Sequence, residues 1–176
     1  MSRTRVNILE LLRGGDRRSI GRAGEVAAFV SGNSRRFREL IEGLWNEDLL
    51  VRMRAADAAE KVTRRHPGHL QPHRNRLLRL MCQTKQQELR WHLAVMIPRL
   101  PLTAKERKVT TSCLITYLAD RSSIVRTCAL QGLADLARDD PGSRAAVIKI
   151  VCEALRKGTP AMKARSRKLL SQLQRQ

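Results

Sequence analysis

The chain has 176 residues, of which 42% are hydrophobic and only 3% aromatic, and its 35 Lys and Arg against 16 Asp and Glu give a net charge of +19. This length suits one domain, residues 1–176, with its own core, and the richness in Ala, Leu and Arg favours helices over sheets. No apolar run approaches the roughly 20 residues that cross a bilayer, and no signal-peptide pattern follows the basic residues of 1–7, so we expect a cytoplasmic protein without a membrane span.

The predicted elements are helices arranged in pairs. Residues 1–33 form a degenerate pair, with helices expected at 6–12 and 20–30 and with glycines that make it irregular. Four clearer pairs follow, over residues 34–66, 69–100, 103–139 and 142–174. The first helices of these pairs carry apolar stripes, which comprise Phe37, Leu40, Ile41 and Leu44; Leu70, Leu77, Leu80 and Met81; Val109, Cys113, Tyr117 and Leu118; and Val147, Ile148, Val151 and Leu155.

The second helix of each pair repeats one pattern. Its anchors Val51, Leu89, Val125 and Met162 are spaced 38, 36 and 37 residues apart. At 4, 7, 8 and 11 residues after each anchor the chain is apolar or small, with Ser166 as the one polar exception. Because these offsets follow one face of an α-helix, we predict that this face is buried in every repeat.

Two segments, Asp48–Ala56 and Asp120–Ala129, place an apolar residue, an arginine and then small residues after a short polar turn. In this they resemble the HEAT repeat family, of the armadillo-like class, and its HEAT-like bacterial relatives, and the likeness extends over residues 34–174. The resemblance implies an all-α fold, a right-handed α-solenoid of stacked antiparallel helix pairs. It implies an architecture rather than an activity, because function depends on the sites that a fold carries.

Four cysteines, Cys82, Cys113, Cys128 and Cys152, are widely separated in the sequence. No Cys-x-x-Cys pair is present, and the spacing suits neither a zinc site nor a compact disulfide framework. Each lies beside apolar neighbours in a predicted helix, where cysteine behaves as a small hydrophobic residue. We therefore expect four reduced thiols in the core.

Four bases, Arg52, Arg90, Arg126 and Lys163, each follow an anchor directly, so that in a solenoid they would stack as a ladder. One interpretation is a binding ladder. The resemblance favours a structural role instead, in which each base contacts an acid or carbonyl of the neighbouring turn, and Asp48 and Asp120 are the available acids.

The face of the second helices opposite the buried one is a candidate binding surface, centred 2, 6 and 9 residues after each anchor. It includes Met53 and Trp91, and Arg54 adjoins it. An exposed Trp91 would stack on a base or anchor a peptide, whereas packing against the next repeat is the structural alternative. This strip is not strongly basic.

The densest run of bases lies between residues 64 and 79, where three histidines accompany it. If the bases converge on one edge they form a track for a polyanion; otherwise they are a solvated surface of an arginine-rich chain. Prolines and a glycine interrupt any helix that would align the histidines, and no nearby acid or cysteine completes a ligand set, so we expect no metal. The candidate binding residues of the run are Arg64, Arg65, Arg74, Arg76 and Arg79.

No phosphate loop, nucleophile elbow or paired-carboxylate motif is present, so we expect no catalytic residue, cofactor or small-molecule substrate. Among HEAT-like enzymes the alkylpurine DNA glycosylases offer Trp and Asp roles that Trp91 and Asp57 could take, but Glu60 lies near Asp57 and would repel phosphate. We predict a non-catalytic binding module or scaffold whose basic surface takes an acidic protein partner. The alternative is binding of nucleic acid, specifically duplex DNA, by a repair-related protein.

Overall fold

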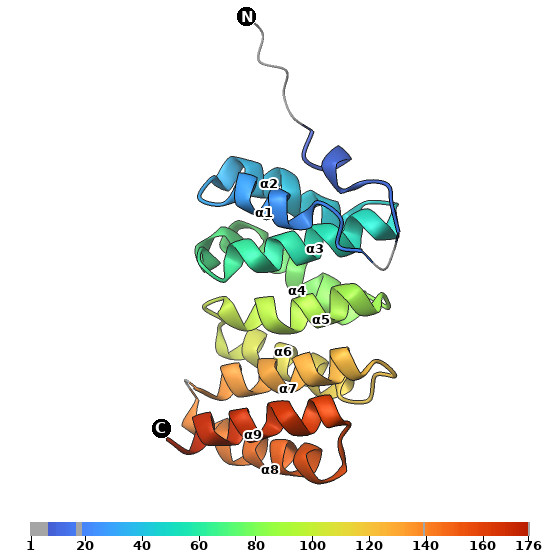
Figure 1. The fold of residues 1–176 in the computed structure, drawn as a ribbon. Helices are drawn as coiled ribbons and strands as arrows, with labels where there is room; N and C mark the ends of the chain where they lie inside the picture. Colours follow the sequence, from blue (N-terminus) through green and yellow to red (C-terminus); the bar gives the residue numbers. More distant parts are fainter. Residues whose placement is uncertain (1–6, 17–18, 139, 176) are drawn as a thin grey trace, which may run out of the picture. The chain divides into compact units, whose positions relative to one another are not determined.

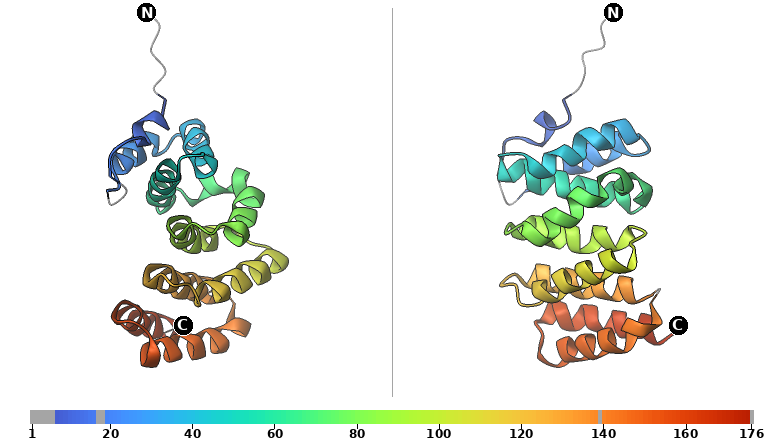
Figure 2. Two further views of the ribbon diagram at one scale, coloured as in Figure 1. Left: turned by 90° about the vertical axis from the view of Figure 1, so that its right-hand side faces the viewer. Right: turned by 180° about the vertical axis from the view of Figure 1, so that it is seen from behind.

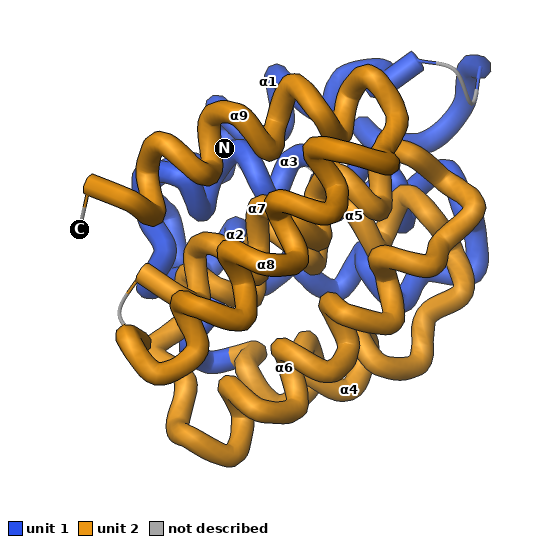
Figure 3. Tube along the Cα trace, turned by 90° about the horizontal axis from the view of Figure 1, so that it is seen from below, with its two compact units in different colours: residues 1–72 blue, residues 73–176 orange. Residues whose placement is uncertain are grey.

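The computed structural model describes residues 7–16, 19–138 and 140–175, and every regular element in these ranges is a helix, which confirms the all-helical class (Figure 1). The predicted helix 6–12 begins outside the described residues at Val6, and Glu10–Leu12 within it forms a 3₁₀ turn. The chain divides into two compact units, residues 1–72 and 73–176, drawn in different colours in Figure 3. The α-helices are α1 (Ala23–Val30), α2 (Ser34–Glu42), α3 (Leu49–Thr63), α4 (Arg74–Gln83), α5 (Gln87–Met96), α6 (Ala104–Tyr117), α7 (Ser123–Arg138), α8 (Pro141–Lys157) and α9 (Pro160–Gln174).

In the first unit, α3 packs against both α1 and α2. Side-chain caps fix where two of these helices begin. Asn33 accepts a hydrogen bond from the backbone N–H of Arg36 at 3.0 Å, and Asp48 accepts one from Leu50 at 2.8 Å. The predicted apolar stripe of α2 and of the 3₁₀ turn after it is fully buried. Its four residues are Phe37, Leu40, Ile41 and Leu44.

The second unit contains three helix pairs, α4 with α5, α6 with α7, and α8 with α9. Its second helices pack in sequence order, α5 against α7 and α7 against α9, and they lie side by side in both views of Figure 2. On the other side α4 packs against α6. A capping box starts α6, where Thr103 and Glu106 bond to each other's backbone N–H groups.

The core of the second helices follows the predicted offsets. All five predicted positions are buried in α3, in α5 and in α7; those of α5 continue into the 3₁₀ turn Ile97–Arg99 and Leu100 after it. In α9 four of the five are buried, and Leu170 is half-buried.

The predicted stripe of α6 is right at Tyr117, but the rest of the buried face is rotated from the prediction. Val109 is 43% exposed and Cys113 is half-buried, while the buried side chains are Thr110, Leu114 and Tyr117. Thr110 can be buried because its hydroxyl donates to the carbonyl of Glu106 at 2.8 Å. Because the buried face includes the polar residue Thr110, the hydrophobicity pattern alone does not identify that face.

Ser166, the one polar residue at a core position, is fully buried in α9, and its hydroxyl meets no hydrogen-bond partner among the described residues. A buried hydroxyl without a partner destabilises a fold, so we expect Ser166→Ala to raise the free energy of unfolding by about 1 kcal/mol in urea titrations. Ser171→Ala, on the half-buried side of the same helix, controls for the higher helix propensity of alanine. An equal gain from both variants would contradict the buried-hydroxyl argument.

Candidate functional site

One turn motif recurs between the helices of three pairs. Asn46, Thr84 and Asp120 stand at equivalent places, and each side chain accepts a hydrogen bond from the backbone N–H two residues later, at 2.9, 3.2 and 2.8 Å. Such bonds fold the chain into a tight turn and leave the next residues ready to begin a helix.

The bases of the predicted ladder follow this turn. Arg52 donates from Nε to the carbonyl oxygen of Asn46, and Arg90 donates from Nε to the carbonyl oxygen of Thr84 at 2.9 Å. Arg126 is half-buried, and its Nε finds no acceptor in the described part of the chain; Lys163 is half-buried as well. Arg52 and Arg90 thus each bind the carbonyl of the turn that precedes their helix.

Arg90 also reaches the next pair, because its Nη1 lies 2.5 Å from Oδ2 of Asp120. The carboxylate side chain is only 3% exposed. Burial by itself would raise the pKa of Asp120, but hydrogen bonds from Ser122 and Arg90, with the positive charges of Arg90 and Arg121, lower it below its ordinary value. This ion pair therefore joins the helix pair α4–α5 to the helix pair α6–α7.

Met53 and Arg54 are not exposed, which corrects two predicted binding residues. Met53 is 8% exposed and Arg54 only 2%. The guanidinium of Arg54 donates to backbone carbonyls of the segment before α1, namely those of Leu12, Gly14, Asp16 and Ser19. The segment covers α3 at this point, and a helical wheel of α3 alone contains no sign of it.

The predicted basic run is divided between the two units. Arg64 and Arg65 are exposed at the end of α3, where Arg64 is held by Glu60 at 2.6 Å. In the second unit Arg74 forms a 3.2 Å ion pair with Glu106, and Arg76 and Arg79 are exposed on α4. The run is thus partly neutralised within each unit and is not one continuous track inside either.

Trp91 is half-buried on α5, and its ring meets that of His92 edge-on, with 5.7 Å between centroids. The indole therefore packs on one side and remains partly accessible on the other. In the ranges that the structure describes, no group of three or more His, Cys, Asp or Glu could hold a metal ion, and no helix is long and apolar enough to span a bilayer.

A polar cluster that the sequence did not indicate lies across α7 and α9. Arg165 donates from Nη1 to Oε1 of Gln131 at 3.0 Å, and Gln131 donates from Nε2 to Oδ1 of Asp135 at 3.0 Å. Arg138 donates from Nη2 to the same carboxylate oxygen at 2.8 Å. We call Gln131, Asp135, Arg138 and Arg165 the Gln131 cluster. Only Gln131 belonged to the predicted strip, so counting the strip's charges missed the arginines beside it.

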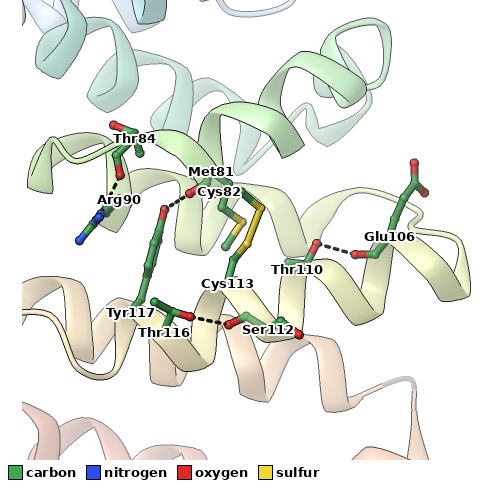
Figure 4. The surroundings of a disulfide bond; sticks show 10 residues. All are labelled: Met81, Cys82, Thr84, Arg90, Glu106, Thr110, Ser112, Cys113, Thr116 and Tyr117. Atoms are coloured by element: carbon green, nitrogen blue, oxygen red, sulfur yellow. Dashed lines mark hydrogen bonds between the residues drawn. A yellow bond between two sulfur atoms is a disulfide. The ribbon is translucent and has the colours of Figure 1, made fainter.

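The expectation of four reduced thiols in the core is wrong in two respects, because two of the cysteines are bonded to each other and none of the four is fully buried, with Cys82 exposed. Cys82 on α4 and Cys113 on α6 form a disulfide whose Cα atoms are 5.9 Å apart (Figure 4). Cys128 and Cys152 remain thiols, and both are half-buried. No sequence pattern indicates this pair, because the two residues are 31 positions apart and meet only when α4 packs on α6.

Tyr117 fixes the same joint between α4 and α6. Its hydroxyl donates to the carbonyl oxygen of Met81 at 2.5 Å, next to the disulfide in Figure 4. Burial raises the pKa of Tyr117, so the phenol stays protonated and keeps donating. The disulfide and this hydrogen bond are therefore structural features of the second unit.

No protein-family model, curated protein or solved structure shows a significant match to this chain.

Proposed function

We propose that the chain is a HEAT-like α-solenoid that acts as a non-catalytic binding module, with the basic surface of its second unit taking an acidic protein partner. The repeated turn, the loop-bound bases that follow it and the sequence-order packing of α5, α7 and α9 support the architecture. In such a fold the second helices present a row of equivalent positions, which suits recognition of an extended surface.

The observation that carries the binding proposal is the imbalance of charge in the second unit. Residues 73–176 contain 21 Lys and Arg against 7 Asp and Glu, a net charge of +14. Four of the acids, Glu106, Asp120, Asp135 and Glu153, are already bonded to bases of the same unit. The net excess of positive charge on this unit favours association with polyanions.

The test is a pair of salt series with the full chain, using poly-L-glutamate and a mixed-sequence DNA duplex as probes. We expect poly-L-glutamate to bind with a Kd of about 10 µM or tighter near physiological salt, and the duplex to bind only in the non-specific range, weaker than about 1 µM. Duplex binding tighter than about 1 µM, with a steep negative salt dependence, would assign the surface to nucleic acid instead. Binding of neither probe would refute a polyanion-binding role.

A further inference from the structure

The Gln131 cluster is a series of hydrogen-bonded side chains that connects α7 with α9 in the second unit. Asp135 holds Gln131 and Arg138 on α7, and Gln131 in turn holds the guanidinium of Arg165 on α9. An arginine normally loses much of its freedom when it binds a ligand. Here the amide of Gln131 already orients Arg165 in the folded chain, so Arg165 loses less conformational entropy when a ligand binds.

The cluster keeps donors for a ligand. A guanidinium has five N–H donors, and the contact with Gln131 engages one of those on Arg165. Arg165 is exposed, and so are Arg138 and Lys168, the last of which lies one turn further along α9. Oriented, exposed guanidinium groups bind carboxylates and phosphates through two parallel hydrogen bonds.

The local charge is positive but moderate. The positive charges of Arg138, Arg99 and Arg165 act on Asp135, although burial of that carboxylate still raises its pKa above the ordinary value. Together with Lys168, which lies one turn beyond Arg165 on α9, these three bases and Asp135 carry a net charge of +3. Tight binding of duplex DNA involves about 6–10 phosphate contacts, and a central carboxylate repels phosphate. A short segment with two or three carboxylates matches the charge better.

We propose that the Gln131 cluster, with Arg99 and Lys168, is the docking site for an acidic peptide segment of the partner protein, whose carboxylates bind Arg165, Lys168 and Arg138. This inference rests on the proposed function and locates it on the exposed side of α7 and α9. Gln131 and Asp135 do not bind the peptide themselves. They are positioning residues, which hold the two arginines toward it.

The decisive experiment compares two double variants that remove the same charge. Arg165→Gln/Lys168→Gln changes the proposed site, and Lys149→Gln/Arg156→Gln changes two exposed bases of α8. The probe is a fluorescein-labelled peptide with a run of glutamates, titrated by fluorescence anisotropy near physiological salt, while circular dichroism verifies the fold. We expect the first variant to weaken binding about tenfold and the second less than about twofold.

A third variant separates positioning from charge. Gln131→Leu leaves the net charge unchanged but releases the guanidinium of Arg165, so we expect about three- to fivefold weaker peptide binding. Equal losses from the two double variants, or an unaffected Gln131→Leu, would overturn the site and leave the proposed function standing, since binding would then follow net charge. If binding of a duplex DNA probe depended on Arg165 and Lys168 while binding of the peptide did not, the site would be assigned to nucleic acid instead of an acidic peptide. Failure of the wild-type chain to bind any polyanion would remove both proposals.

Discussion

Replacing Arg54 by alanine is expected to lower the free energy of unfolding of the first unit by about 4 kcal/mol. All five N–H donors of this buried guanidinium are used, because it makes five hydrogen bonds of 2.5 to 3.2 Å to the carbonyls of Leu12, Gly14, Asp16 and Ser19. Alanine would leave these carbonyls without their donor and would open a cavity beneath the segment. Urea unfolding followed by circular dichroism measures the loss.

The segment around this guanidinium is shaped to receive it. Gly14, Gly15 and Gly21 have φ values of 70°, 79° and 51°, a region that side chains disfavour, and a Cβ on Gly21 would lie 2.8 Å from Cζ of Arg54. Arg54→Lys keeps the charge, but its single ammonium group cannot reach all the carbonyls that surround the planar guanidinium. We therefore expect lysine to recover less than half of the stability that Arg54→Ala loses.

Arg65→Ala is the matched control for these variants, because Arg65 is exposed just after α3, beyond the covered part of that helix. We expect it to change stability by less than about 0.5 kcal/mol. If Arg54→Ala cost no more than Arg65→Ala, the segment before α1 would not depend on the guanidinium.

Arg54 also shows where prediction from the sequence reached its limit. Periodicity located the core of α3, α5 and α7, because burial of one helix face follows from spacing alone. Arginine is ordinarily exposed, so the residue type alone favours a surface position for Arg54. Its burial depends on a loop that no periodic pattern describes. The glycines of that loop, which made the first pair look degenerate, were the available signal.

The candidate site was less predictable than the core for a related reason. Arg165 and Gln131 are 34 positions apart, and they meet only through the packing of α9 on α7. Counting charges along the centre of each helix face gave a neutral strip, whereas Asp135, Arg138 and Arg165 flank that centre and bond across it. Helix positions are encoded locally in the sequence, but contacts between helices depend on how side chains of both interlock.

Reduction of the Cys82–Cys113 disulfide is expected to lower the free energy of unfolding of the second unit by about 3 kcal/mol. The bond closes a loop between residues separated by 31 positions, and a cross-link of that size restricts the unfolded chain more than the folded one. In the folded unit α4 and α6 already pack together, and Tyr117 bonds to Met81 beside the sulfur atoms. The folded state therefore loses little when the bond opens, and the cost appears as extra freedom of the unfolded state.

The measurement is urea unfolding with and without dithiothreitol, and with a Cys82→Ser/Cys113→Ser variant. We expect this variant to match the reduced wild type and to be insensitive to dithiothreitol, whereas Cys128→Ser/Cys152→Ser should retain the full response. A wild type that is equally stable with and without reductant would contradict a stabilising cross-link. A reducing compartment, such as the cytoplasm that the sequence analysis predicts, keeps thiols reduced. There, the packing of α4 on α6 and the hydrogen bond of Tyr117 would have to hold this joint without the cross-link.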